Sequence, residues 1–288
     1  MKISVIDIGS NSVRLMLWAD GYTLYKKIQT TRLGEGLSLT GIINPKAVER
    51  SVDCVCKFFE IAKKENSDKI FAFATAAVRR AKNGFEFVQA VKSACGLDIE
   101  VVSGDIDAKM GFLGALGTNK GAIIDIGGAS TEITVGKNEK IDFAKSIDIG
   151  TVRLKDLCGE DKEKLKAVIT DKIFEFGNIS LSNVYAIGGT ATTLVSLSKK
   201  LKEYDPNIVH GSKLTKGEVF ALSEKLLSST QEERLNMDGM EKGRADVIGG
   251  GALLLAMIMD KFNLQFITVS EKDNLEGFLV YKKERGEL

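Results

Sequence analysis

Asp7-Ile8-Gly9-Ser10-Asn11-Ser12 and Asp125-Ile126-Gly127-Gly128-Ala129-Ser130 are the two stretches that decide the fold. Each follows an apolar, β-rich segment, and the pattern Asp-Ile-Gly-x-x-Ser returns 118 residues after its first occurrence, from position 7 to position 125. A match of six residues is weak by itself. Its position after a strand in both places nevertheless predicts an internal repeat.

The segments around the two stretches also repeat in order. Residues 3–8, 13–19 and 22–32 predict an antiparallel meander of three strands, and residues 122–126, 131–135 and 141–147 predict a second. Helices and strands alternate after each meander, with helices expected over 45–64, 84–94, 163–176, 215–227 and 244–261. The chain is therefore expected to be an α/β protein of two domains, residues 1–117 and 118–274. The terminal helix, about 275–288, is expected to pack back on the first domain.

Length and composition agree with two globular domains. A chain of 288 residues is long for one core, and its 44% hydrophobic and 27% charged residues are ordinary values. The net charge of +1 gives no general attraction to nucleic acid or membranes, so no nucleic-acid or membrane partner is expected. Without a signal-like start or an apolar run of 18 residues, a cytoplasmic location is expected. Four cysteines and one histidine favour reduced thiols over a zinc site.

The glycine loops have the chemistry of phosphate sites. A glycine after a strand allows a sharp turn in which successive backbone N–H groups form a concave nest for phosphate oxygens. A third loop, Gly188-Gly189-Thr190, ends a strand and begins a helix, whose N-terminus also favours an anion. The alternative for each loop is a tight hairpin closed by Gly and Ser or Asn. The candidate phosphate-binding residues are Gly9, Ser10, Asn11, Ser12, Arg79, Gly127, Gly128, Ala129, Ser130, Thr131, Gly188, Gly189 and Thr190.

Two carboxylates suggest a divalent cation at these loops. Asp7 and Asp125 stand at the carboxyl ends of their strands, where ligands of α/β sheets gather. A carboxylate beside phosphate would repel it unless a metal ion lay between the two. Arg79 also follows a strand end and can neutralise phosphate, although an ordinary helix-surface arginine is the alternative.

These residues belong to a wider pattern. The chain resembles the Ppx/GppA family, exopolyphosphatases and guanosine pentaphosphate phosphohydrolases of the actin-like ATPase superfamily, over nearly its whole length. The resemblance is carried by residues 7–15, 32–37, 74–83, 125–132, 149–154, 188–194, 209–211 and 244–248. It implies two ribonuclease-H-like domains with a phosphate cleft between them, and removal of a terminal phosphate with Mg²⁺. A monovalent cation such as K⁺ is a further candidate cofactor, and a homodimer is a candidate state.

The resemblance also implies roles for two carboxylates. Glu132 occupies a position that helps to place the water or the metal, which makes Asp7, Asp125 and Glu132 the candidate metal ligands. The catalytic base of the family is the second glutamate of a Ser-Gly-x-Glu-Glu-Ala motif, and here the segment Ser103–Ala108 places Asp107 at that position. Aspartate is one methylene shorter, and a misplacement of about 1 Å can lower a rate on the order of a hundredfold. Asp107 is therefore a working base, a weak base or a relic.

Three hypotheses of function follow. The first is a Mg²⁺-dependent phosphohydrolase acting on inorganic polyphosphate or guanosine pentaphosphate, with Asp107 and Glu132 as catalytic residues. The second is a weakly active or inactive module that binds the same polyanions, motivated by Asp107. The third is an actin-like kinase or ATPase, for which the sequence shows no acceptor pocket.

Overall fold

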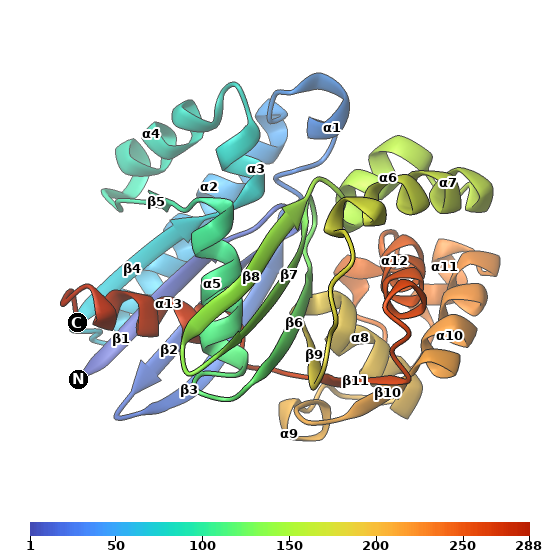
Figure 1. The fold of residues 1–288 in the computed structure, drawn as a ribbon. Helices are drawn as coiled ribbons and strands as arrows, with labels where there is room; N and C mark the ends of the chain where they lie inside the picture. The colour runs from blue at the N-terminus through green and yellow to red at the C-terminus, as the bar shows by residue number, and fades with distance from the viewer. The chain divides into compact units, whose positions relative to one another are not determined.

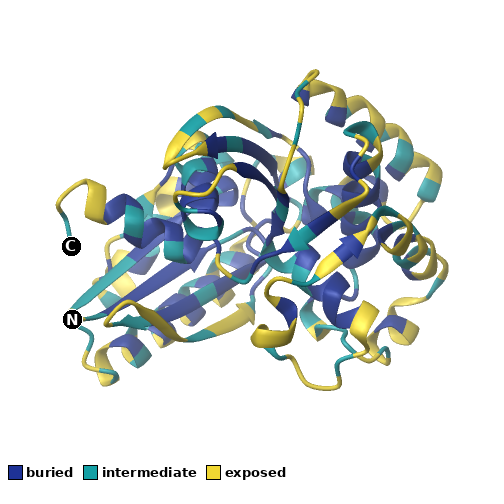
Figure 2. Cartoon of the chain, turned by 60° about the horizontal axis from the view of Figure 1, so that its bottom comes forward, coloured by how far each residue is buried: buried dark blue, intermediate teal, exposed yellow.

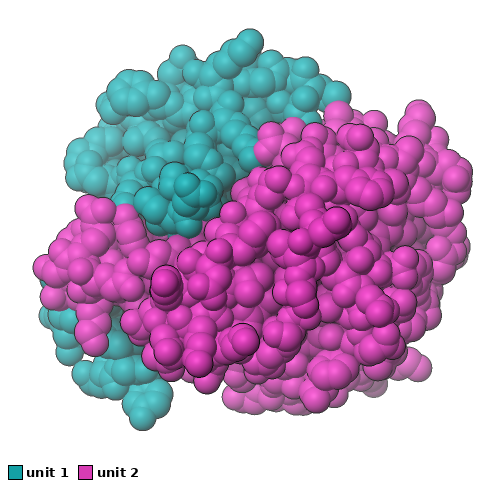
Figure 3. Space-filling model, viewed as in Figure 1, with its two compact units in different colours: residues 1–107 teal, residues 108–288 magenta.

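The computed structural model describes residues 1–288 and contains two sheets, each surrounded by helices (Figure 1). By its internal contacts the chain divides into two compact units, Met1–Asp107 and Ala108–Leu288, shown in different colours in Figure 3. Buried residues concentrate on the central strands, and the outer helices carry most of the exposed positions (Figure 2). No helix is long and apolar enough to cross a membrane.

The first unit is built on a five-stranded sheet of order β3-β2-β1-β4-β5. Strands β1 (Lys2–Ile8), β2 (Ser12–Ala19) and β3 (Tyr22–Thr30) form the antiparallel meander predicted from the sequence. Strands β4 (Lys69–Ala74) and β5 (Glu100–Val101) continue the sheet parallel to β1. The unit also contains helices α1 (Leu37–Thr40), α2 (Pro45–Lys64), α3 (Ala76–Arg80) and α4 (Gly84–Cys95).

Helix α2 covers the centre of this sheet. It begins where the sequence predicts, because Pro45 stands at its first position and the Asn44 side chain accepts a hydrogen bond from the Lys46 N–H at 2.9 Å. Its apolar face, including Val55 and Phe58, packs on β1 and β2. Helix α4 packs in turn against α2, so the core lies between the sheet and this pair of helices.

The second unit repeats the same strand order. Its sheet runs β10-β11-β9-β6-β7-β8, so β8-β7-β6-β9-β11 corresponds to β3-β2-β1-β4-β5 of the first unit. The strands are β6 (Gly121–Ile126), β7 (Thr131–Lys137), β8 (Lys140–Ile147), β9 (Val184–Ile187), β10 (Lys213–Thr215) and β11 (Phe266–Val269). The meander is again antiparallel, and β9 and β11 are again parallel to the first strand. This duplicated order is that of a ribonuclease-H-like fold, as expected, and it confirms the internal repeat.

Helices cover both faces of the second sheet. One face packs on the larger group, namely α6 (Thr151–Cys158), α7 (Lys162–Ile173), α8 (Gly188–Lys199), α10 (Lys216–Ser228) and α12 (Ile248–Lys261). Helix α5 (Gly104–Ala115), through Phe112, packs on the other face against Ile123 and Ile187. The remaining helices are α9 (Pro206–Val209), α11 (Gln231–Leu235) and α13 (Asn274–Glu284).

Several element boundaries differ from those expected. The helix expected from residue 244 begins at Ile248, because residues 242–244 form a short 3₁₀ turn before it. The helix expected to reach residue 176 ends at Ile173 and continues as a 3₁₀ turn over Phe174–Phe176. Strand β3 ends at Thr30 rather than Arg32, which has a left-handed φ of 53°. The one-turn helices α1, α3, α9 and α11 and strand β10 were not predicted, because so few residues show no periodicity.

Helix α13 crosses α5 at two glycines. A β-carbon on Gly277 would lie 1.8 Å from the Met110 carbonyl oxygen, and one on Gly114 would lie 1.9 Å from that of Asp273. The backbones of the two helices are therefore in direct contact. The predicted boundary at residue 117 placed α5 in the first domain, and the compact units divide within α5, so the predicted domain extents stay a prediction.

This crossing generates the first prediction. Gly277→Ala should destabilise the protein by about 3 kcal/mol, because the methyl group meets backbone atoms that cannot rotate away. Gly217→Ala is the matched control, since a β-carbon on this helical glycine of α10 meets no atom within 4 Å. Thermal and urea unfolding measure both variants. Equal unfolding midpoints for Gly277→Ala and the wild type would contradict the close crossing.

Candidate phosphate and metal sites

The loop of the first unit presents N–H groups and a buried amide. Gly9 N–H donates to the Ser12 carbonyl at 3.0 Å and closes the turn between β1 and β2. The carbonyls of Ser10 and Asn11 accept hydrogen bonds from residues 31, 32 and 34 at 2.8–3.0 Å, so they are held by the segment after β3. The backbone N–H groups of the same two residues donate to no backbone acceptor. The loop therefore has its acceptors occupied and its donors available, as a phosphate nest requires.

The Asn11 side chain is the clearest sign of a ligand. The residue is only 5% exposed, yet neither the oxygen nor the nitrogen of its amide has a hydrogen-bond partner in the chain. Leaving a buried polar group unsatisfied costs about 1–3 kcal/mol per group. Such groups in folded proteins call for a functional explanation, and a bound oxyanion supplies acceptors for the amide nitrogen.

Asp7 lies directly opposite Arg14 in the β1–β2 ladder. Its Oδ2 accepts hydrogen bonds from Arg14 Nε at 2.9 Å and from Nη2 at 2.5 Å. The positive charge beside Asp7 is therefore the Arg14 guanidinium. The role of Asp7 as a metal ligand stays a prediction.

Arg79 and Asp107 are brought together in the same unit. Arg79 belongs to the short helix α3, and its Nη1 donates to the Val102 carbonyl at 2.7 Å. The same nitrogen lies 4.0 Å from Asp107 Oδ2. Asp107 is 6% exposed, in the first turn of α5. The candidate base and the candidate phosphate-binding arginine are therefore neighbours, which spacing in the sequence did not indicate.

The second unit has the same loop, but a helix and not an extended segment donates to its carbonyls. Gly127 N–H donates to the Ser130 carbonyl at 3.0 Å, as in the first unit. The carbonyls of Gly127 and Gly128 accept hydrogen bonds from the N–H groups of residues 151–153, the first turn of α6, at 2.8–3.0 Å. Gly150 permits this contact, because a β-carbon there would lie 2.6 Å from the Gly127 oxygen. The N–H groups of residues 128–130 donate to no backbone acceptor, so this loop also presents donors.

Two carboxylates stand opposite each other beside this second loop. Asp125 pairs with Glu132 in the β6–β7 ladder, at the register that Asp7 and Arg14 occupy in the first unit. Glu132 is 5% exposed, and its Oε1 accepts a hydrogen bond from Ser146 Oγ at 2.6 Å. Like charges directly opposite on neighbouring strands repel, and a cation between them relieves the repulsion. No group of three or more His, Cys, Asp and Glu side chains is arranged to hold a metal. Further ligands of a metal held by this pair would be water or phosphate oxygens, which suits Mg²⁺.

The third loop, residues 188–190, contacts the side chains of Asp125 and Arg244. Gly188 has a φ of 81°, and a β-carbon there would lie 2.9 Å from Asp125 Oδ1. Helix α8 begins at this residue without a side-chain cap. The Arg244 guanidinium covers Gly189, where a β-carbon would lie 1.7 Å from its Nη2, and its Nε donates to Glu241 at 2.8 Å. No role was predicted for Arg244 from the sequence, although a basic residue one helical turn before the glycine run at 249–251 was a usable signal.

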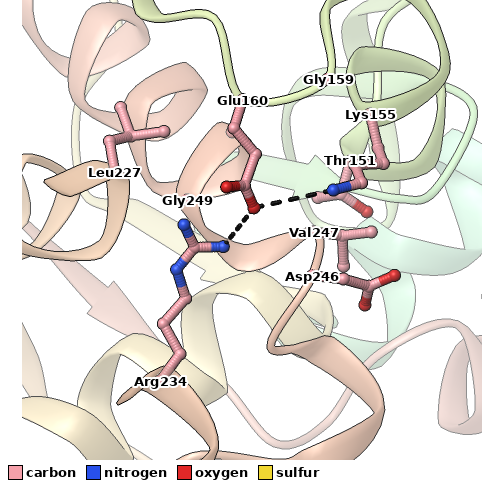
Figure 4. Close-up of a pocket in the computed structure, with 10 residues that line it drawn as sticks. Thr151, Lys155, Gly159, Glu160, Leu227, Arg234, Asp246, Val247 and Gly249 are labelled. Carbon is pink, nitrogen blue, oxygen red and sulfur yellow. Dashed lines mark hydrogen bonds and ion pairs between the residues drawn. The ribbon is translucent and has the colours of Figure 1, made fainter. Parts of the chain in front are cut away.

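A small polar pocket lies between α6, the end of α10 and the start of α12 (Figure 4). The buried Arg234 donates to the carbonyls of Leu226, Ser229 and Ala245, and to Glu160 Oε1 at 2.7 Å. Figure 4 shows the Glu160 carboxylate between Arg234 and Lys155, whose Nζ lies 3.6 Å from Oε1. Arg234 therefore connects α10, the segment before α12 and the α6–α7 connection.

The glycine run in α12 has a packing role here. β-Carbons on Gly249 and Gly251 would lie 3.0 and 2.7 Å from side chains of Leu227 and Thr151. These contacts favour close helix packing as the reason for the small residues.

The ion pair in this pocket predicts a pH dependence. The hydrogen bond from Arg234 is the main cause that lowers the pKa of Glu160 below 4.5, so the carboxylate stabilises the fold above that pH. The stabilisation is lost as the pH falls through the lowered pKa. Glu160→Gln should lower Tm at pH 7 by about 2–4 °C, as expected for roughly 1 kcal/mol in a chain of this size. The difference from the wild type should narrow toward pH 3, as measured by calorimetry.

The control is Glu163→Gln, which removes an 82% exposed carboxylate from an ion pair on the same unit and should leave Tm nearly unchanged. An equal Tm difference for Glu160→Gln at both pH values would contradict the assignment.

Relatives of known sequence and structure match almost the whole chain. A bifunctional 3-dehydroquinate synthase/phosphatase of Fusobacterium nucleatum is 31% identical over 96% of the chain, which spans 46% of that protein. Exopolyphosphatase 2 of Mycobacterium tuberculosis is 29% identical, over 96% of this chain and 97% of its own. The crystal structure of the Aquifex aeolicus Ppx/GppA family member has a TM-score of 0.81 at 28% identity. It covers 100% of this chain and 99% of its own.

The family assignment rests on a match that extends beyond the loops. The model of the Ppx/GppA phosphatase family matches residues 16–285, which include α5, the second loop, the α8 loop and α13. The two-sheet architecture and the similarity to the Aquifex aeolicus structure agree with it. The chain belongs to the Ppx/GppA phosphatase family.

Proposed function

We propose that this protein is a Mg²⁺-dependent phosphohydrolase that releases terminal phosphate from inorganic polyphosphate or guanosine pentaphosphate. The names of its relatives support this activity, since they include exopolyphosphatases and a guanosine-5′-triphosphate,3′-diphosphate pyrophosphatase. The observation that carries the proposal is found in the second unit, where the half-buried Asp125 and the buried Glu132 stand opposite each other beside a loop that presents backbone N–H groups. Phosphoanhydride hydrolysis needs charge neutralisation on the transferred group and an oriented water molecule.

Asp125 and Glu132 are the residues that would hold Mg²⁺. Ser146 fixes the orientation of Glu132 through the hydrogen bond at 2.6 Å. When bound, the ion neutralises charge on the phosphate oxygens. The N–H groups of residues 128–130 bind phosphate oxygens without requiring side-chain movement. In the first unit the Asn11 amide and the N–H groups of the loop bind phosphate in the same way.

Asp107 is the proposed general base. It is buried, and α5 fixes its backbone, because its N–H donates to the Ser103 carbonyl at 2.9 Å. The neighbouring Arg79 guanidinium favours the charged carboxylate, which can accept a proton from water. Arg79 remains available to phosphate through the rest of its donors, since a guanidinium carries five N–H groups.

A second candidate function is binding without rapid hydrolysis. The observation that favours it is the Arg79–Asp107 contact, because a carboxylate engaged by a guanidinium is a poorer base. Aspartate also reaches less far than the glutamate typical of the family at this position. In this case the chain binds polyphosphate or a guanosine nucleotide and releases phosphate slowly.

Removal of the metal-binding carboxylate tests the first function. Glu132→Gln should lower kcat for orthophosphate release from polyphosphate on the order of a hundredfold, because a charge that positions the metal is lost. Glu139→Gln is the control, as Glu139 is exposed in the turn between β7 and β8. Phosphate release measured at several Mg²⁺ concentrations separates metal affinity from turnover. Equal rates in Glu132→Gln and the wild type would rule out the proposed role.

Substitutions of Asp107 separate the two functions. If Asp107 is a working base, Asp107→Asn should abolish turnover while polyphosphate affinity, measured by calorimetry, remains within about threefold. If Asp107 is too short, the wild type should bind with only slow turnover, and Asp107→Glu should raise the rate of phosphate release by up to about a hundredfold. Asp105→Asn is the matched control, because Asp105 is exposed on the same helical turn. An active Asp107→Asn variant would contradict both readings.

A further inference from the structure

Two of the four free cysteines lie against each other on neighbouring helices of the first unit. Cys56 is in the middle of α2, Cys95 is the last residue of α4, and both are half-buried. The Cys56 thiol donates a hydrogen bond to Cys95 Sγ, and the Cys95 thiol donates to the Val91 carbonyl of its own helix at 3.4 Å. Because α4 packs on α2, the folded chain keeps the two sulfur atoms together.

The other two cysteines have different surroundings. Cys54 is 1% exposed and packs in the core under α2, although it is only two residues from Cys56. Two residues turn a helix through about 200°, so Cys54 faces the sheet while Cys56 faces α4. Cys158 belongs to the core of the second unit. A hydrogen bond between two thiols brings their side chains into the short range that a disulfide requires, and Cys56 and Cys95 meet this condition.

The two thiols of the pair differ in their readiness to attack an oxidant. Burial is the main cause that raises the pKa of Cys56 to about 12, and its hydrogen bond to Cys95 and the nearby carboxylates of Asp53 and Glu60 add to this rise. Cys56 therefore keeps its proton near neutral pH. Since the thiolate is the attacking form of a cysteine, Cys56 is not suited to react first, and this step falls to Cys95.

We propose that Cys56 and Cys95 are a redox modification site at which glutathione disulfide, or another small disulfide, links α2 to α4 covalently. Cys95 Sγ attacks one sulfur of glutathione disulfide and forms a mixed disulfide, and the Cys95 proton leaves with the first glutathione. Cys56 Sγ then attacks Cys95 Sγ, the mixed bond breaks, and the Cys56 proton goes to the second glutathione. Two protein thiols are oxidised by two electrons, and one glutathione disulfide is reduced to two thiols.

The bridge closes a covalent loop over residues 56–95, which includes the helix that carries Arg79. A β-carbon on Gly84, the first residue of α4, would lie 2.0 Å from the Val78 carbonyl oxygen, so α4 begins in direct contact with the backbone of α3. The bridge holds the other end of the same helix on α2. It therefore stabilises the first unit by restricting its unfolded chain, and it restrains the helix that supports α3.

The experiment incubates the full chain with excess glutathione disulfide and counts free thiols after denaturation. The wild type should lose two of its four thiols, and mass spectrometry of its peptides should join position 56 to position 95. Tm should rise by about 5–10 °C, as expected for a bridge over a loop of this length in a chain of this size. Dithiothreitol should restore four thiols and the original Tm.

Single variants assign the two sulfur atoms. Cys56→Ser should form no bridge and should retain glutathione on Cys95 as the mixed disulfide. Cys95→Ser should leave the Cys56 thiol unmodified, because its proton is held. Cys54→Ala is the matched control, since it removes the neighbouring thiol on the core face of α2 and should still form the bridge.

Three results would overturn the inference. They are four thiols retained by the wild type, a bridge that uses Cys54 or joins two chains, and a bridged form whose Tm equals that of the reduced chain. Thiol counts and Tm are measured without substrate, so the result is independent of the proposed hydrolysis.

Discussion

The rest of the site depends on backbone hydrogen bonds that fix the carbonyl groups of the two glycine loops on the side away from the predicted ligand. In the first unit the segment after β3 donates to Ser10 and Asn11, and in the second unit the first turn of α6 donates to Gly127 and Gly128. A peptide unit whose carbonyl is fixed also has its N–H fixed, because the two groups share one plane. Both loops therefore point donors in set directions before any ligand arrives, which reduces the reorganisation needed for binding.

The two repeats have diverged at one ladder position. Both carry an aspartate on the first strand, but its partner across the ladder is Arg14 in the first unit and Glu132 in the second. In the first unit the opposite charges satisfy each other. In the second, two like charges stand opposite each other, and this is the pair proposed above to hold Mg²⁺.

Much of this architecture could be predicted from the sequence, and the missing parts have physical reasons. Helix α2 was predicted with its observed bounds, because Pro45 marks its start and twenty residues show a clear apolar face. The loops were recognised because glycine after an apolar strand is a local signal. The Asp7–Arg14 pair was not foreseen, although the meander alone would have placed the two side chains opposite each other. Arg234 gave no signal, since an arginine among glutamates is typical of an exposed helix, and only tertiary structure surrounds it with three carbonyls.

Because the first turn of α6 holds the second loop, the opening of the loop and the exposure of the first α6 amides are coupled. The amide protons of Thr151, Val152 and Arg153 are protected by Gly127 and Gly128 rather than by carbonyls of their own helix. They can exchange with solvent only when the loop releases them, whereas amides deeper in α6 depend on unwinding of the helix. The exchange rates of these three amides therefore report how often the second loop opens. Hydrogen exchange can measure this opening without a label attached to the loop itself.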